Sequence, residues 1–326
     1  MSFDVPDGQL FCLLGPNGAG KTTTVSILTT TLMPTAGRVR IAERDLATEQ
    51  ALVRRDLGIV FQQPSLDLNL TAEENIRLHA VLYGLYPWRP SYRMMPGAYR
   101  RQVQDLAGVL GLADVLGRRT RILSGGMRRK LEIVRALMHQ PLVLFLDEPT
   151  AGLDPESRRS LWTYLQQIRR QYGTTVFLTT HYLEEAEAAD SLCVLSRGRI
   201  IERGSPSDVK ARYTRAELVL GTVDGAALRR ELLTLGLQVN GTAPLRVPLD
   251  GRSAQSIIRA LESELTRFQI VQPTLEDTYL RMLKAQNIEP TRLACRPGAG
   301  PVHELWAMLV IAQRDVIKCG TAPGWR

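Results

Sequence analysis

The sequence has 326 residues, enough for about two domains, and its apolar (44%) and charged (23%) fractions are those of a globular protein. Its net charge of +8 suits nucleic acid or an anionic membrane only weakly, because a genome that prefers arginine over lysine gives the same excess. Four scattered cysteines without a CxxC pair argue against a zinc site or a disulfide framework and suit a reducing cytosol. No run approaches the ~18 apolar residues of a membrane span and no signal peptide is recognisable, so if membranes matter another chain must cross them.

The first elements predict a strand that leads into a glycine-rich loop. Phe3–Val5 alternates in polarity before the turn residues Pro6-Asp7-Gly8, which predicts half of a hairpin. Leu10–Leu14 is a short apolar run of the kind that forms a buried strand. The helix that follows is expected to begin near Thr23.

The loop between this strand and this helix has the composition of a phosphate-binding loop. Gly15-Pro16-Asn17-Gly18-Ala19-Gly20-Lys21-Thr22 fits the pattern Gly, four residues, Gly-Lys-[Ser/Thr] at every defined position. A helix N-terminus presents free N–H groups and partial positive charge, and the glycines let the backbone curl around a phosphate. Lys21 is expected to contact the outer phosphates and Thr22 to offer its hydroxyl to Mg²⁺. A glycine-rich turn without a ligand is disfavoured, because both flanking elements also fit.

The next strands end near the same edge of the predicted sheet. Gly37–Ile41 alternates like an exposed strand, and Gly58–Phe61 is an apolar run that ends at Gln62. Ligands of open α/β sheets bind beyond the carboxyl ends of the strands. Gln62 therefore has two interpretations, a ligand of Mg²⁺ or of a water molecule, or a plain loop residue.

A helical section interrupts the α/β pattern and predicts an inserted helical subdomain at about residues 69–138. Thr71 to Glu74 has the form of a capping box and opens a helix. Ser124, Gly125 and Gly126 precede another apolar-periodic run, which makes a second candidate anion site at a helix N-terminus. Taken alone, Ser124 would be an ordinary helix cap; beside a phosphate loop, the binding role is favoured.

Polar side chains follow two further strands. Leu142–Leu146 is the most continuous apolar run and ends in Asp147 and Glu148, where buried carboxylates are costly unless they face a cation or transfer a proton. Asp147 suits an indirect Mg²⁺ partner, and Glu148 suits a general base for the water that attacks a γ-phosphate. His181 ends the strand Thr174–Thr180 and is expected to contact that phosphate. Glu184–Glu187 is expected to be a solvated helix face.

The remainder of the chain changes in character. Residues 213–286 alternate between strand and helix patterns and predict a small α+β domain, with no reactive residues, for regulation or assembly. Residues 287–326 predict a linker and a tail in which His303–Lys318 is amphipathic, suited to a membrane surface or a partner helix. Residues 1–212 are predicted to form the first domain.

Together these motifs resemble the ATP-binding subunit of an ABC transporter. The phosphate loop resembles Walker A, Gln62 the Q-loop, and Leu123–Met127 the family signature. Asp147 and Glu148 resemble Walker B and its base, Leu153-Asp154 the D-loop, and His181 the switch histidine. The Gly-Gly-Met variant and Pro273–Asp277 resemble daunorubicin-resistance exporters that pair with ABC-2 permeases.

The resemblance implies an α/β P-loop NTPase fold with a helical subdomain and a mechanism that needs two chains. ATP and Mg²⁺ would lie between Walker A of one chain and Ser124-Gly125-Gly126 of the other, in a head-to-tail homodimer. The expected partner is an ABC-2 type permease, as a separate chain or a fused part, at the cytoplasmic face of the membrane. The exported substrate would be a drug, lipid or polysaccharide, and no nucleic-acid partner is expected.

Two departures from the family keep alternatives open. The family begins with a strand and an adenine-stacking aromatic residue about twenty residues earlier, so a truncated or misplaced start is expected, with weaker nucleotide affinity. The tail resembles the start of a fused permease, which predicts a fragment of an ATPase–permease fusion. The alternatives are an inactive fragment of this kind and a non-transport ABC ATPase that acts on nucleic acid or the ribosome.

Overall fold

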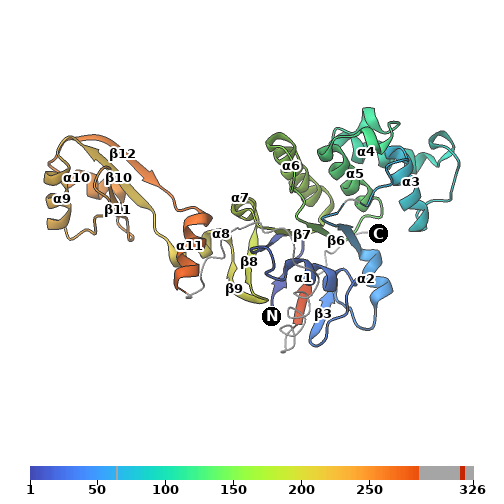
Figure 1. Ribbon diagram of the computed structural model, residues 1–326, viewed down its shortest axis with the longest axis horizontal. Helices are drawn as coiled ribbons and strands as arrows, with labels where there is room; N and C mark the ends of the chain where they lie inside the picture. The colour runs from blue at the N-terminus through green and yellow to red at the C-terminus, as the bar shows by residue number, and fades with distance from the viewer. Residues whose placement is uncertain (64, 286–315, 320–326) are drawn as a thin grey trace, which may run out of the picture. The chain divides into compact units, whose positions relative to one another are not determined.

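The computed structural model describes residues 1–63, 65–285 and 316–319, and its chain divides into two compact units (Figure 1). One unit contains Met1–Arg203 together with the strand at 316–319, and the other begins at Gly204. The domain limits expected from the sequence, 1–212 and 213–286, stay predictions. Most of the predicted linker and tail, 287–326, lies outside the described residues.

A six-stranded sheet forms the centre of the first unit and has the order β5-β6-β7-β2-β8-β9. All four pairings from β5 to β8 are parallel, and every residue of β2, β6 and β7 is buried. Parallel strands covered on both faces read as continuous apolar runs, which is why such runs predicted β2 and β6. The prediction of β7 came from the strand-favouring residues of Thr174–Thr180. The strands are β2 (Leu10–Leu14), β5 (Leu57–Val60), β6 (Val143–Asp147), β7 (Thr175–Thr180), β8 (Ser191–Ser196) and β9 (Arg199–Gly204).

Helices connect these strands and cover the sheet. Val25 and Leu28 of α1 join Phe11, Phe145 and Phe177 of three strands in one apolar cluster. This packing fixes the start of α1 directly beyond the end of β2. The helices outside the inserted section are α1 (Lys21–Leu28), α2 (Gln50–Asp56), α6 (Pro155–Tyr172) and α7 (Leu183–Glu187).

A second, smaller sheet corrects the hairpin prediction for Phe3–Val5. Strand β1 (Asp4–Val5) pairs with β13 (Val316–Cys319) in a four-stranded sheet of order β1-β13-β3-β4, with β3 (Arg38–Ile41) and β4 (Arg44–Asp45). It does not pair with β2, because both edges of β2 are already occupied by β7 and β8. Residues 316–318 of the predicted amphipathic tail thus lie in a strand, and its remainder lies outside the described residues.

Between β5 and β6 the described chain forms helices, which gather at one end of the first unit (Figure 1). The capping box predicted at Thr71 is confirmed, since its hydroxyl accepts from Glu74 N and the Glu74 carboxylate accepts from Thr71 N. The buried Tyr99 hydroxyl donates to Glu73 at 2.9 Å and joins two of the helices. They are α3 (Ala72–Leu82), α4 (Gly97–Val109) and α5 (Gly125–Leu137), with 3₁₀ turns at Tyr92–Met94, Ala113–Val115 and Thr120–Ile122.

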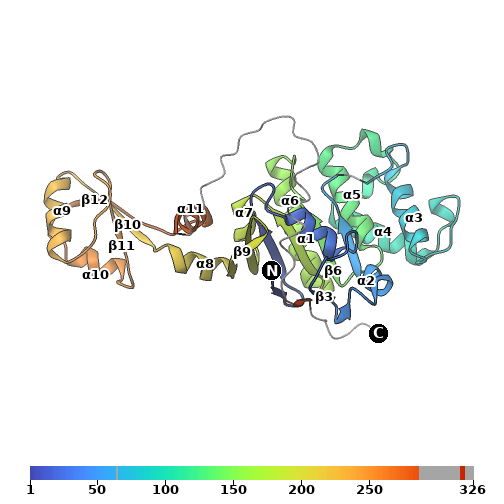
Figure 2. The same cartoon turned by 60° about the horizontal axis from the view of Figure 1, so that its bottom comes forward.

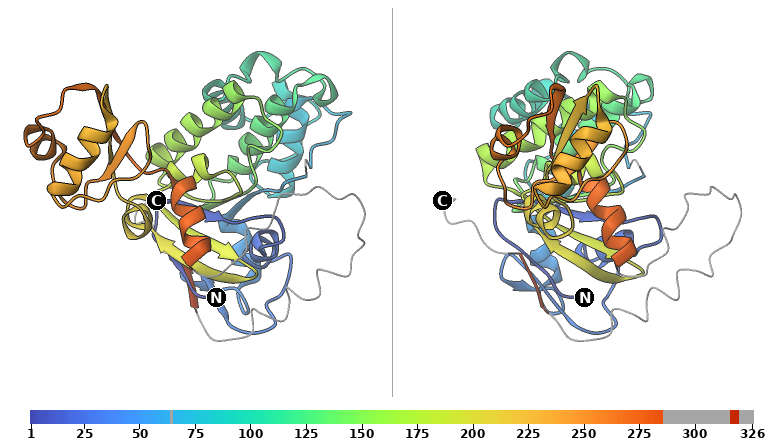
Figure 3. Two further views of the ribbon diagram at one scale, coloured as in Figure 1. Left: turned by 60° about the vertical axis from the view of Figure 1, so that its left-hand side comes forward. Right: turned by 90° about the vertical axis from the view of Figure 1, so that its left-hand side faces the viewer.

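The second unit is an antiparallel three-stranded sheet with helices (Figures 2 and 3). Leu218 and Leu220 of β10 pack with Leu228 and Leu232 of α9 and Ile257 of α10 in its own apolar core. The elements are α8 (Pro206–Tyr213), β10 (Glu217–Thr222), α9 (Gly225–Thr234), β11 (Leu245–Pro248), α10 (Ala254–Arg259), β12 (Leu265–Val271) and α11 (Leu275–Ala285).

Candidate functional site

The glycines of the loop between β2 and α1 are required by its geometry. Gly18 and Gly20 have φ angles of 78° and 103°, which residues with a side chain rarely adopt. At Gly15 an added Cβ would lie 2.5 Å from the carbonyl oxygen of Leu195, so the loop packs too closely for any side chain. The sequence-predicted loop is therefore held against β8 in a curled conformation, with Thr22 exposed and Thr23 half-buried on the first turn of α1.

Lys21 is buried in this loop with 5% exposure. Its Nζ donates to the carbonyl oxygens of Gly15 at 2.8 Å and Pro16 at 3.2 Å. It also lies 3.4 Å from a carboxylate oxygen of Glu148. The ammonium group is thus fixed at the N-terminal end of α1, where positive charge and free N–H groups are concentrated.

Asp147 ends β6 and is 2% exposed. Its Oδ1 accepts a hydrogen bond of 2.5 Å from Thr179 of the neighbouring strand β7. Within the described residues, this carboxylate has no ion-pair partner within 4 Å. The nearby Arg129 guanidinium interacts electrostatically with Asp147 but bonds its backbone carbonyl oxygen rather than the carboxylate. A buried carboxylate with one hydroxyl donor and no direct ion pair fits a metal site, since a poorly paired buried charge is costly.

Glu148 is where the predicted site residues meet. One of its oxygens lies 3.4 Å from both Lys21 Nζ and His181 Nδ1, and the other accepts a 3.3 Å hydrogen bond from Gln62 Nε2. The backbone of Glu148 has a φ of 45°, and its N–H donates to Thr179. The loop after β6 thus turns sharply and directs this carboxylate toward the phosphate loop and the ends of β5 and β7.

Ser124 and Asp154 are each at the start of a helix. Ser124 caps α5 by accepting from Met127 N at 3.2 Å, and Asp154 caps α6 by accepting from Glu156 N and Ser157 N. The hydrogen bonds from the side chain and N–H of Ser157 lower the pKa of the Asp154 carboxyl. In the described part of the chain, no hydrogen bond or ion pair joins Ser124, Gly125 or Gly126 to the phosphate loop. The structure therefore brings Lys21, Gln62, Glu148 and His181 together and leaves the Ser124 loop apart.

Three buried charged side chains near the site were not predicted from the sequence, because no motif or spacing marks them. Arg129 and Glu132 of α5 are 7% and 1% exposed and form an ion pair with a 3.1 Å contact. Glu185 is 3% exposed, so the prediction that it lies on a solvated face was wrong. It accepts hydrogen bonds from Thr150, in the loop after β6, and from Thr180, the last residue of β7.

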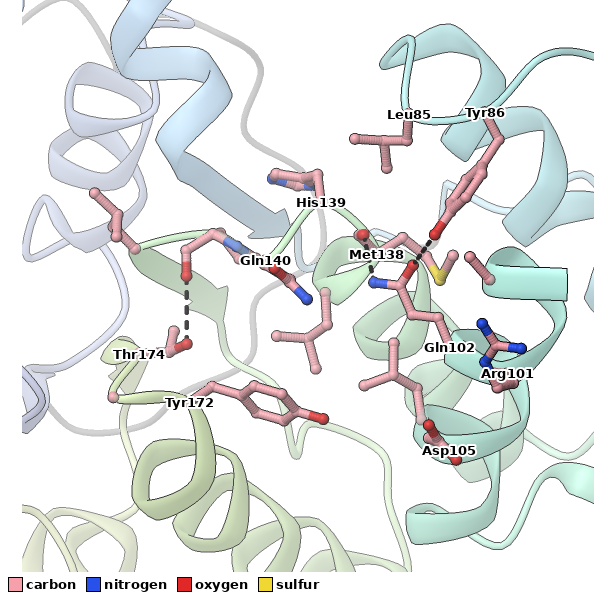
Figure 4. Close-up of a pocket in the computed structure, with 16 residues that line it drawn as sticks. Leu85, Tyr86, Arg101, Gln102, Asp105, Met138, His139, Gln140, Tyr172 and Thr174 are labelled. Atoms are coloured by element: carbon pink, nitrogen blue, oxygen red, sulfur yellow. Dashed lines mark hydrogen bonds between the residues drawn. The ribbon is translucent and has the colours of Figure 1, made fainter. Parts of the chain in front are cut away.

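A pocket of about 610 Å³ lies away from these residues (Figure 4). It is lined by α4, by the connections that precede β6 and β7, and by residues after α3, among them Gln102, His139 and Tyr172. Because it lies before the strands begin, it is distant along both strands from the predicted site at their carboxyl ends. None of the sequence-predicted site residues lines it.

Comparison with known proteins decides the family. The family model described as "ABC transporter" matches residues 1–151. The daunorubicin/doxorubicin resistance ATP-binding protein DrrA of Streptomyces peucetius is 33% identical over 86% of this chain and 86% of its own. The chain belongs to the ATP-binding subunits of ABC transporters. Its α/β fold with a P-loop is therefore the fold predicted from the sequence.

Further relatives agree with this assignment. The Nod factor export ATP-binding protein I of Ralstonia nicotianae is 35% identical over 86% of this chain and 87% of its own. A solved structure, the dimeric post-hydrolysis state of the ATP-binding cassette MJ0796 bound to ADP and Pi, has a TM-score of 0.53 and 28% identity. It covers 61% of this chain and 86% of its own.

This ABC transporter subunit is an ATP-binding protein and an ATPase. Its relatives include exporter subunits, which favours the exporter interpretation over an ABC ATPase that acts on nucleic acid or the ribosome. Among the described residues, no helix combines the length and the apolar character needed to cross a membrane.

Proposed function

We propose that this subunit hydrolyses ATP with Glu148 as the general base and drives an ABC-2 type exporter. The proposal rests on the convergence of Lys21, Gln62 and His181 on the carboxylate of Glu148. A base that accepts a proton from the attacking water contributes typically 10²–10⁴-fold to the rate. Lys21 would bind the outer phosphates of ATP, and His181 would contact the γ-phosphate.

The proposed Mg²⁺ ligands are Thr22, Gln62 and Asp147. They are oxygen donors, which Mg²⁺ prefers, and Asp147 would act through a water molecule. Bound Mg²⁺ would neutralise charge on the phosphate oxygens. The buried carboxylate of Asp147, which lacks an ion-pair partner within the described residues, supports this assignment.

We further propose a head-to-tail homodimer in which Ser124, Gly125 and Gly126 of one chain bind the ATP held by the phosphate loop of the other. The N-terminus of α5 is an anion site of the kind that helices offer. Asp154 would lie at the same dimer interface. A γ-phosphate held between two helix N-termini favours the closed dimer, whereas ADP lacks that bridging group.

The proposed partner is an ABC-2 permease in the membrane, which would place the subunit at the cytoplasmic face. Exposed apolar side chains on α3 and the segment after it support a protein contact there, because they are concentrated in a short stretch. These are Leu78, Leu82, Tyr83, Leu85 and Trp88. The names of the relatives, which mention daunorubicin and Nod factor export, support export of a drug-like, lipid or polysaccharide substrate.

A Glu148→Gln variant tests the central claim. Removing the base while keeping the shape of the side chain should trap ATP in a closed dimer. Size-exclusion chromatography with light scattering should show a dimer with ATP and Mg²⁺ and a monomer with ADP. The matched control is Glu184→Gln, which replaces an exposed carboxylate. This variant should hydrolyse ATP like the unmodified protein. A monomer with both nucleotides would contradict the proposed dimer.

A further inference from the structure

Three charged side chains of α5 hold the segment that contains Gln62. Arg129 Nη1 donates to the carbonyl oxygen of Phe61 at 2.5 Å, and Glu132 Oε1 accepts from the backbone N–H of Ser65 at 2.7 Å. Arg135 donates to the carbonyl oxygen of Ser65 at 2.8 Å and also to its hydroxyl. Gln62 therefore lies in a short loop whose two ends are bound to one helix.

The same helix also holds the loop that carries the predicted base. Arg129 Nη2 donates to the carbonyl oxygen of Asp147 at 2.8 Å, and its Nε donates to that of Pro149 at 3.1 Å. These two carbonyls flank Glu148. Charged donors make stronger hydrogen bonds than neutral ones, and these are buried, so they fix the backbone firmly.

We propose that Arg129, Glu132 and Arg135, here called the α5 clamp, are positioning residues that hold Gln62 in its place beside Glu148. Because α5 begins at Ser124, the clamp also makes Gln62 move with the Ser124 loop. This inference rests on the proposed function, in which Gln62 serves the chain's own ATP and Ser124 serves the ATP of the partner chain. The clamp thereby links the two ATP sites of one dimer through a single helix.

A positioning role and a merely structural role of these residues predict different kinetic effects of substitution. If the clamp acts by placing Gln62, its loss should lower kcat with little change in nucleotide affinity, because the phosphate loop is untouched. Misplacement of a reacting group by about 1 Å can cost around 100-fold in rate. Substituting the clamp residues should also have no further effect on kcat once Gln62 itself is removed, since effects on one shared interaction are not additive.

The experiment compares Arg135→Gln and Glu132→Gln with the control Arg128→Gln, a neighbour on α5. Each is made in the full chain with Gln62 and in the Gln62→Ala variant. Steady-state hydrolysis gives kcat, titration with a fluorescent ATP analogue gives Kd, and thermal unfolding reports folding. Arg135→Gln and Glu132→Gln should lower kcat by about 10- to 100-fold and leave Kd within about twofold of the control. In Gln62→Ala they should lower kcat by less than about twofold.

Three results would overturn the inference. The first is a kcat within about twofold of the control in folded Arg135→Gln. The second is an equal loss of kcat with and without Gln62, and the third is a parallel loss of kcat and nucleotide affinity. If Glu132→Gln does not fold, the result for Arg135→Gln decides whether the inference holds. Arg135→Lys should retain part of the kcat that Arg135→Gln loses, because it keeps a charged donor. An unmodified protein without ATPase activity would instead refute the proposed function, and the clamp with it.

Discussion

His181 Nδ1 and Lys21 Nζ lie at the same distance, 3.4 Å, from a single carboxylate oxygen of Glu148. The third neighbour, Gln62, donates to the other oxygen. One carboxylate thus engages the groups that are proposed to bind phosphate. In the proposed function, Lys21 exchanges its contact with Glu148 for a contact with phosphate when ATP binds.

The exchange predicts that Glu148→Gln binds ATP more tightly than the unmodified protein. The variant removes a negative charge beside the proposed phosphate site and breaks the competing ion pair with Lys21. A charge-assisted contact of this kind contributes about 1 kcal/mol or more, so the Kd should fall by about fivefold or more. Titration with a fluorescent ATP analogue measures this, and hydrolysis should fall by about 10²–10⁴-fold in parallel. An unchanged or higher Kd would contradict the proposed competition.

The close packing of the phosphate loop predicts a second effect. Gly15→Ala would place a methyl group 2.5 Å from the carbonyl oxygen of Leu195, so the loop must shift away from β8. The shift moves N–H groups that are expected to bind phosphate, and nucleotide affinity should fall by about tenfold or more. Gly108→Ala is the matched control, because an added Cβ on this helix of the first unit meets nothing within 4 Å. An affinity of Gly15→Ala equal to that of the control would show that the loop tolerates the shift.

Local patterns predicted the parts of the fold and site that depend on neighbours in sequence. The glycine pattern at Gly15–Gly20 requires only a strand, a turn and a helix in succession. The capping box at Thr71 requires a partner three residues away, and it is confirmed. Continuous apolar runs predicted the buried strands β2 and β6, because both faces of a parallel sheet are covered. Residues that favour strands predicted β7.

Long-range packing decided what the sequence could not predict. Thr179 reaches Asp147 only because β6 and β7 are adjacent in register. Glu185 lies among acidic residues that read as a solvated face, yet it is buried because two threonine hydroxyls accompany it. Strand β1 was assigned to a hairpin with β2, and it pairs instead with a strand from the far end of the sequence. None of these long-range contacts produces a repeating pattern in the sequence from which it could be predicted.

The cluster formed by the rings of His79, Tyr83 and His139 predicts a pH dependence of stability. Burial, followed by the charges of His139 and Arg135, lowers the pKa of His79 from 6.5 to about 3. Burial also lowers the pKa of His139. Between pH 6.5 and 3 the unfolded chain binds a proton at His79 that the folded chain does not bind. Stability therefore decreases as pH falls through this range, by about 1.4 kcal/mol per unit and about 2 kcal/mol between pH 7 and 5.

His79→Phe tests this assignment, because it keeps an aromatic ring in the cluster and removes the group that titrates. Free energies of urea unfolding at pH 7 and pH 5 should differ by about 2 kcal/mol less in His79→Phe than in the unmodified protein. An unchanged pH dependence in His79→Phe would assign the effect to other groups.

Glu185 joins the loop after β6, which carries Glu148, to the last residue of β7, which directly precedes His181. Glu185→Gln leaves one carboxamide oxygen for the hydroxyls of Thr150 and Thr180, and it removes the charge that lies 3.9 Å from Arg158. Loss of a buried, charge-assisted hydrogen bond should destabilise the protein by about 1–3 kcal/mol, which lowers Tm by several degrees. The kcat should also fall, because the loop that carries Glu148 and the strand end that precedes His181 lose a shared attachment. The neighbouring exposed Glu184→Gln should change stability by less than about 0.5 kcal/mol. If thermal unfolding and hydrolysis assays find the two variants alike, Glu185 does not hold these loops together.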